Sequence, residues 1–112
     1  MNQELSKETQ EKITQLQMME QALQNSVLQK QQLSTQLIEI DSAIKELETT
    51  PKSYKIIGNI MIDTNKIELT KDLIKKKEST ELRIFTIEKQ EQRFQEKAKS
   101  MQEELMKEIK GD

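Results

Sequence analysis

Two residues divide this chain into segments with different folding preferences. Pro51 and Gly58 are the helix breakers of its interior, and the stretches at about 2–49 and 66–110 contain neither proline nor glycine. Glu, Lys, Gln and Leu are abundant in both stretches, and these residues favour helices. The sequence therefore predicts two long helices separated by a short connector of a different kind.

The connector, YKIIGNIMI from Tyr54 to Ile62, has the composition of β-strands. Its isoleucines are β-branched and suit a pleated surface, and Gly58-Asn59 separates two apolar runs where a two-residue turn needs a positive φ. We expect a β-hairpin at about 53–63. A lone strand pair is marginally stable, so its edges should pair with other subunits. The alternative is an apolar patch that closes a simple helical hairpin.

Apolar residues of both long stretches recur at alternating spacings of three and four, which is typical of a coiled coil. If the chain reverses at Gly58-Asn59, residue i lies level with residue 117 − i, and the two seams coincide in every layer. The predicted fold class is mainly α, a single domain over 1–112. It is a long antiparallel two-helix coiled coil with a central β-hairpin that assembles with other subunits into a β-barrel. Asn65, followed by Glu68, is the predicted N-cap of the second helix.

Charge and composition exclude several classes of function. The 18 basic and 20 acidic residues give a net charge of −2, so no nucleic-acid or anionic-membrane partner is expected. Cysteine is absent, which removes disulfides, thiolate catalysis and zinc-thiolate sites, and histidine is absent too. No catalytic or phosphate-binding motif is present, so we expect no enzyme, no catalytic or metal site and no cofactor. Without a signal peptide or a membrane-length apolar stretch, we expect a cytoplasmic location.

Apolar residues near the two chain ends exceed what a seam uses. Thr9, Lys12 and Glu108 are polar seam positions, so we expect the helices to splay there. The splayed ends should expose these apolar residues. Methionine is common among them, and it adapts to irregular partners. The alternative is that they are frayed coiled-coil residues. The candidate residues for binding an irregular apolar partner are Leu5, Ile13, Leu16, Met18, Met19, Met101, Leu105, Met106 and Ile109.

The predicted hairpin is mainly apolar on both faces, since side chains alternate along a strand. Ile57, Ile60 and Ile62 share one face with Lys55, and the opposite face carries Tyr54, Ile56 and Met61 with Asp63. The candidate assembly residues are Tyr54, Ile56, Ile57, Ile60, Met61 and Ile62.

With this hairpin and the segment ELRIFTIEKQEQR from Glu81 to Arg93, the chain resembles the β-type subunits of archaeal prefoldin over essentially its whole length. The resemblance implies a hetero-hexamer of two α-type and four β-type subunits. Its hairpins form double β-barrels, and its coiled coils project from these barrels. It also implies an ATP-independent holdase that binds unfolded polypeptides, its clients, and delivers them to a group II chaperonin. The resemblance places client binding at the coiled-coil tips, which correspond to the chain ends, and so makes the candidate residues there client-binding residues.

Two alternatives remain at this point. A eukaryotic β-type subunit would have several different partner chains. A structural coiled-coil scaffold or adaptor would join two partners without binding any client.

Overall fold

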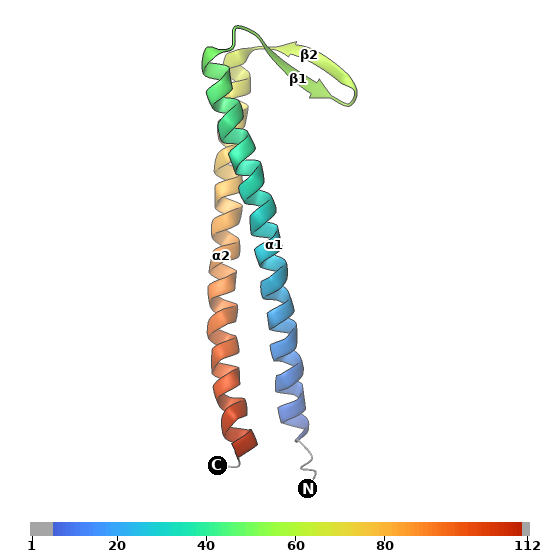
Figure 1. The fold of residues 1–112 in the computed structure, drawn as a ribbon, viewed down its shortest axis with the longest axis vertical. Coiled ribbons are helices and arrows are strands. Elements are labelled where there is room, and N and C mark those ends of the chain that lie inside the picture. Colours follow the sequence, from blue (N-terminus) through green and yellow to red (C-terminus); the bar gives the residue numbers. More distant parts are fainter. Residues whose placement is uncertain (1–5, 111–112) are drawn as a thin grey trace. The chain divides into compact units, whose positions relative to one another are not determined.

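The computed structural model describes residues 6–110, which form two long helices and two strands. The order along the chain is α1 (Lys7–Thr49), β1 (Ser53–Ile57), β2 (Ile60–Thr64) and α2 (Lys66–Lys110) (Figure 1). The predicted fold, two helices joined by a β-hairpin, is confirmed. The expected start of the first helix at about residue 2 and the candidate residue Leu5 lie outside the described residues.

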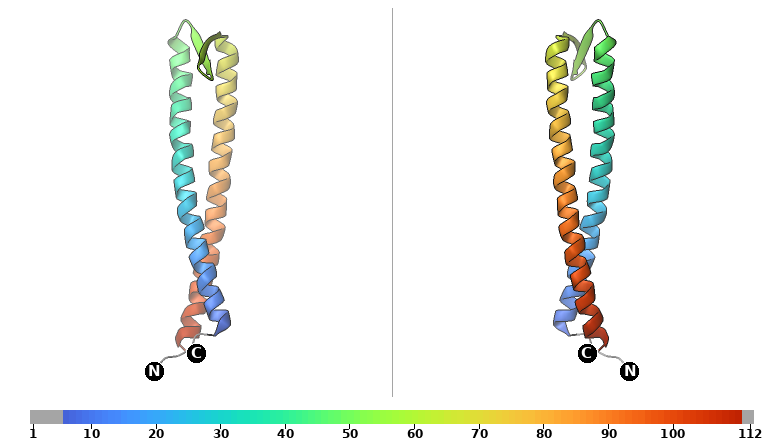
Figure 2. Two further views of the ribbon diagram at one scale, coloured as in Figure 1. Left: turned by 90° about the vertical axis from the view of Figure 1, so that its right-hand side faces the viewer. Right: turned by 90° about the vertical axis from the view of Figure 1, so that its left-hand side faces the viewer.

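The chain packs as two compact units. The central unit is Lys30–Phe85, and the terminal unit combines the residues up to Gln29 with those from Thr86 onward. In each unit, a segment of α1 lies beside a segment of α2 that runs in the opposite direction (Figures 1 and 2). That residues 1–112 form a single domain stays a prediction.

The strands β1 and β2 pair antiparallel in the predicted register, from Ser53 opposite Thr64 to Ile57 opposite Ile60. Gly58 has a φ of 61°, and among the described residues no non-glycine has a positive φ. A two-residue turn with a positive φ at its first position alone is a type II′ turn, which favours glycine there. The β-hairpin is therefore confirmed, and glycine is required at only one of its two turn residues.

Side chains cap both helices at their first turn. The Asn65 Oδ1 atom accepts hydrogen bonds from the backbone amides of Ile67 (2.9 Å) and Glu68 (3.4 Å), which confirms the predicted cap of α2. At the start of α1, Ser6 Oγ accepts from the Thr9 amide at 3.1 Å, a cap that the sequence analysis did not predict. Each cap satisfies amides that have no partner within the helix.

Burial follows the predicted seam. In the central unit the helix residues Leu33, Ile40, Leu47 and Thr80 are buried, and in the terminal unit Thr9, Ser26, Glu91, Ala98 and Leu105 are buried. Of the seam positions that the structure describes, Glu108 alone is classed as exposed. No described large side chain falls below 2% exposure. Each unit is thus held by a line of contact between two helices, and neither has a broad hydrophobic core.

The cap of α2 can be tested by replacing Asn65 with Ala. We expect the free energy of unfolding, from urea titration followed by circular dichroism, to fall by about 1 kcal/mol, because two helix amides lose their partner. Asn65→Asp should retain most of the stability. Asn59→Ala, in the turn, is the matched control and should change it by less than about 0.5 kcal/mol. Equal stability of Asn65→Ala and the native chain would contradict the role of the cap.

Candidate interaction surfaces

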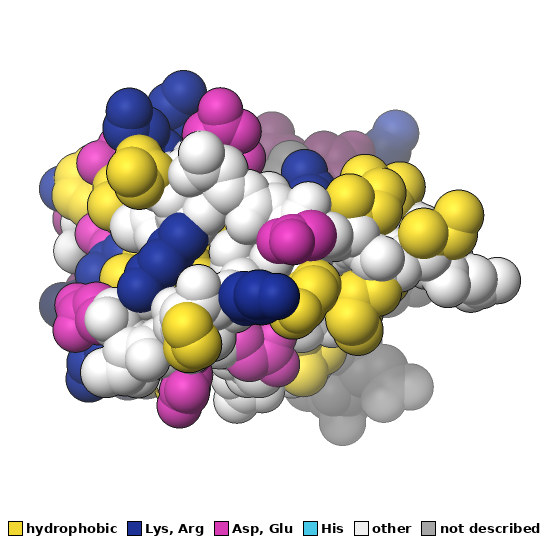
Figure 3. Space-filling view, turned by 90° about the horizontal axis from the view of Figure 1, so that it is seen from above, with side chains coloured by type: hydrophobic (Ala, Val, Ile, Leu, Met, Phe, Trp, Pro, Cys, Tyr) yellow, Lys and Arg dark blue, Asp and Glu magenta, His cyan; other side chains and the backbone are white. Residues whose placement is uncertain are grey.

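The hairpin carries the first candidate surface. All six predicted assembly residues are exposed, from 45% for Ile62 to 68% for Ile56. The strand register places the pair Ile57 and Ile60 on one face and the pair Ile56 and Met61 on the other. Figure 3, which looks onto the hairpin end, shows hydrophobic side chains gathered on the side where the hairpin lies. In the isolated chain, the hairpin therefore presents apolar side chains on both of its faces.

Polar contacts fasten the base of the hairpin. Ser53 is only 5% exposed, and its Oγ donates to the Thr64 carbonyl oxygen at 3.0 Å, within the last strand pair before the helices. The Lys66 ammonium donates to the Thr50 carbonyl oxygen at 3.1 Å and so links the start of α2 to the residue after α1. Two hydrogen bonds thus join the incoming and outgoing segments of the chain at the base of the hairpin.

The terminal unit carries the second candidate surface, which is less uniform. Met18, Met106 and Ile109 are 54–67% exposed, whereas Leu105 is buried at 6%. The remaining predicted client-binding residues in the described part are half-buried: Ile13, Leu16, Met19 and Met101. Their role in binding stays a prediction. The structure separates them into residues that a partner reaches directly and residues that the helix pair covers.

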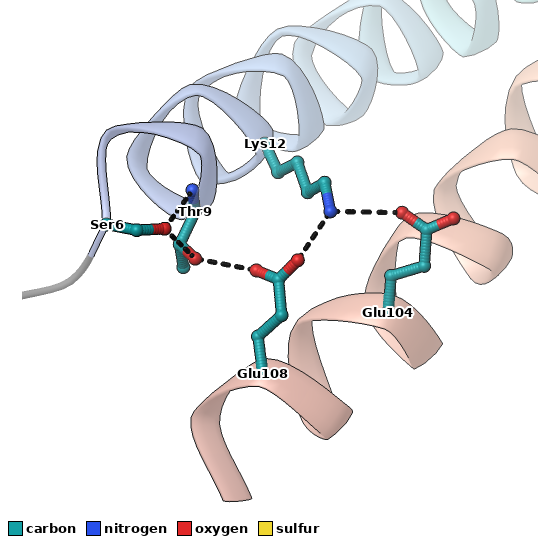
Figure 4. Close-up of polar contacts among 5 residues, drawn as sticks. All are labelled: Ser6, Thr9, Lys12, Glu104 and Glu108. Carbon is teal, nitrogen blue, oxygen red and sulfur yellow. Dashed lines mark hydrogen bonds and ion pairs between the residues drawn. The ribbon is translucent and has the colours of Figure 1, made fainter. Parts of the chain in front are cut away.

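Five polar residues link the two helices at the end of the terminal unit (Figure 4). Thr9 Oγ1 donates to Glu108 Oε2 at 2.6 Å, and Lys12 Nζ lies 2.5 Å from Glu108 Oε1 and 3.4 Å from Glu104 Oε2. Since the Thr9 hydroxyl donates to Glu108, Ser6 Oγ donates to Thr9 Oγ1, at 2.8 Å. We call Ser6, Thr9, Lys12, Glu104 and Glu108 the polar clasp.

The clasp corrects one expectation. The helices were expected to splay at Thr9, Lys12 and Glu108, but these side chains bond to one another across the helix pair, and Thr9 is only 4% exposed. The pattern of polar seam positions was right. The inference of splaying was wrong, because it treated each polar residue as a gap and not as a partner of the others.

Two seam lysines, Lys12 and Lys77, share an arrangement that the sequence analysis missed. By the register, Lys12 lies level with the buried Leu105, and its ammonium pairs with Glu104 and Glu108 beside that leucine. In the central unit, Lys77 lies level with the buried Ile40, and its ammonium is 2.8 Å from Asp41 Oδ1. A lysine stem can cover apolar surface while its charge reaches the edge. In both cases an acidic residue is the sequence neighbour of the aliphatic residue that lies level with the lysine: Glu104 next to Leu105, and Asp41 next to Ile40. This pattern in the sequence could have predicted the contacts.

Hydrogen bonding shifts the pKa values within the clasp. The hydrogen bond from Lys12, followed by that from Thr9, lowers the pKa of Glu108 below its usual 4.5. The hydrogen bond to Glu108 raises the pKa of Lys12 above 10.5, and Glu104 adds to this effect. Glu108 and Lys12 therefore carry opposite charges over the whole range between about pH 4.5 and pH 10.5.

Further apolar side chains are exposed outside the two predicted surfaces. They fall off the seam spacing, so the periodicity that located the seam did not select them. They are Val27, Leu28, Ile38, Ile67, Ile74, Leu82 and Phe85.

Two other kinds of site can be assessed for the described residues. Residues 6–110 contain no group of three or more acidic, cysteine or histidine residues placed to hold a metal ion. In the same range, neither helix is both long enough and apolar enough to cross a membrane.

These features define a class of protein: a two-helix coiled coil whose central hairpin and chain ends both expose apolar side chains. The chain matches the family described as prefoldin subunit over residues 10–112 and belongs to it. This is a family of chaperones whose β subunits work in hetero-oligomeric complexes, and it is not a family of enzymes.

Individual relatives agree with this assignment. The chain is 33% identical to the prefoldin subunit beta of Archaeoglobus fulgidus, covering 91% of this chain and 90% of that protein. It is 35% identical to that of Methanospirillum hungatei, covering 97% and 93% respectively. Its structure is similar to the crystal structure of the prefoldin beta subunit from Thermococcus strain KS-1, with a TM-score of 0.81, 31% identity and coverage of 93% and 94%.

The pKa of Glu108 predicts how acid affects the clasp. A lowered pKa means that the charged form of Glu108 stabilises the folded state above about pH 4.5, and that this contribution is lost as the pH falls through the lower folded value. Glu108→Gln should therefore reduce thermal stability at pH 6, and the difference from the native chain should shrink toward pH 3. Two charged groups lie near Glu108: Lys12 on α1, and Glu104 on α2 with Glu108 itself. Lys12 stays charged throughout this range because its pKa is raised above 10.5.

The control for this pH series is Glu103→Gln, which removes an exposed carboxylate from the same helix. A deficit of Glu108→Gln that is the same at pH 3 and pH 6 would contradict the role of the Glu108 charge.

Proposed function

We propose that this chain is the β-type subunit of a cytoplasmic, ATP-independent holdase. In this proposal it assembles with α-type subunits and further β-type subunits into a hexamer of two α and four β chains. The complex binds non-native polypeptides at the free ends of its coiled coils and delivers them to a group II chaperonin. Family membership supports the chaperone role. The exposed apolar side chains support two separate roles, assembly at the hairpin and client binding at the chain ends.

The hairpin is suited to permanent assembly. Its apolar side chains are mostly isoleucine, which has few rotamers and packs well on a pleated surface. Covering the exposed part of each such side chain contributes about 1 kcal/mol. The outer edges of a two-stranded sheet also carry backbone groups that a neighbouring strand can pair with. Both features favour a closed sheet made from several hairpins.

The free ends are suited to transient binding, and the exposure of Met18, Met106 and Ile109 is the observation that carries this part of the proposal. Methionine has a flexible, polarisable side chain that fits irregular apolar partners. A single chain offers few such contacts, so each arm binds weakly. Several arms in one complex raise the effective concentration of contacts and can hold a client that one arm would release.

The client-binding assignment is tested by replacing Met18, Met106 and Ile109 with Ser in the assembled complex. We expect native mass spectrometry to show an unchanged particle, while suppression of aggregation of a chemically unfolded enzyme falls at least about threefold in potency. The matched control is Ile38→Ser in the central unit, since Ile38 and Met18 are both 67% exposed. Full activity of the triple variant would rule out the free ends as the holding surface.

Assembly is tested by two paired variants of the hairpin, Ile57→Ser with Ile60→Ser and Ile56→Ser with Met61→Ser, one pair for each face. After mixing with an α-type subunit, we expect at least one pair to weaken the six-chain particle more than tenfold, because two apolar contacts are lost in each subunit. Lys55→Ser is the control within the same strands. If both paired variants still gave a full-sized particle, the hairpin would not be the assembly surface.

A further inference from the structure

The polar clasp lies at the end of the terminal unit, among the candidate client-binding residues of both helices. It joins residues of α1 to residues of α2 that lie 96 and 99 positions away along the chain. The clasp layers include the buried Leu105, whose helix neighbours Met106 and Ile109 are exposed. A closed clasp thus divides one apolar region into an exposed part and a covered part.

The clasp consists of partly exposed ion pairs and hydrogen bonds, which break readily when the helices separate. The side chains of Lys12 and Glu108 are 27% and 34% exposed, and that of Glu104 is 56% exposed. Ion pairs in contact with water add little net stability and are weakened by salt. Water can also replace each hydrogen bond when the helices separate, whereas separating an apolar layer leaves its side chains without substitute contacts.

We propose that the polar clasp is a gate on the client-binding surface. When it is closed, it keeps the two helices paired and Leu105 covered. When it opens, Leu105 and the half-buried Ile13 and Met101 join Met106 and Ile109 in one continuous apolar surface for a non-native polypeptide. This inference rests on the proposed function, because it assumes that clients bind at the free ends.

Charge reversal tests the gate. Lys12→Glu places three carboxylates where the clasp had two and a cation, and should open it. Combining Lys12→Glu with Glu108→Lys restores an opposite pair and should close it again. Lys77→Glu is the matched control, since it breaks the corresponding pair with Asp41 in the central unit.

Helix separation can be measured directly, because the chain has no cysteine of its own. Spin labels on Glu11→Cys and Lys107→Cys, both exposed and outside the clasp, report the separation by pulsed EPR in complexes where labelled chain is diluted with unlabelled chain. We expect longer and broader distances for Lys12→Glu, and near-native distances for the charge-swap variant and for Lys77→Glu.

The same complexes are then assayed for suppression of aggregation. We expect Lys12→Glu to need about threefold less complex for half-suppression, and the charge-swap variant to return to the native value. Unchanged distances in Lys12→Glu would overturn the clasp as the closing contact. Increased distances without improved suppression, or equal improvement in Lys77→Glu, would overturn the gate.

Failure of the gate and failure of the proposed function give different results. If the gate fails but the holdase is real, the triple Ser variant still loses suppression. If the free ends bind no client, the triple Ser variant keeps full suppression whatever the EPR distances show.

Discussion

The two-residue turn at Gly58-Asn59 fixes the register of the hairpin, and contacts far from it follow the same numbering. Strand pairing places Ser53 opposite Thr64, and in the terminal unit Thr9 bonds to Glu108. Both pairs obey the same register, in which the two residue numbers sum to 117. Between the hairpin and these distant contacts, neither helix contains a proline or glycine that would shift the seam. The contacts of the hairpin and of the terminal unit thus follow one numbering, although three residues separate α1 from β1 and one residue separates β2 from α2.

Periodicity and turn chemistry were sufficient to predict the hairpin, the Asn65 cap and the seam, because each depends on local rules. They were not sufficient at Lys12, Glu104 and Glu108. Spacing shows which face a residue lies on, but not how far a long side chain reaches or which carboxylate it meets. The buried Leu105 lies level with Lys12 and beside the clasp, so its burial was missed for the same reason. Exposure of the hairpin was predictable, since the sequence offers no third strand to cover it.

The two apolar surfaces differ in chemistry as well as in place. The hairpin uses mainly isoleucine on a strand pair whose base is fastened by Ser53 and Lys66. The terminal unit uses methionine together with leucine and isoleucine, on helices joined by partly exposed polar contacts. Stiff side chains on a fixed base favour one defined partner, and flexible side chains on a separable helix pair favour many. The contrast matches the proposed split between assembly and holding.

The terminal unit combines the start of α1 with the end of α2, which is made much later on the ribosome. Thr9 bonds to a residue 99 positions later, so at usual rates of synthesis it waits roughly 5–20 s for its partner. Leu16 and Leu23 lie level with Met101 and Phe94 in the register, so neither has an opposite helix to cover it until those residues are made. During its own synthesis, a chain proposed to hold unfolded polypeptides is therefore briefly one of them.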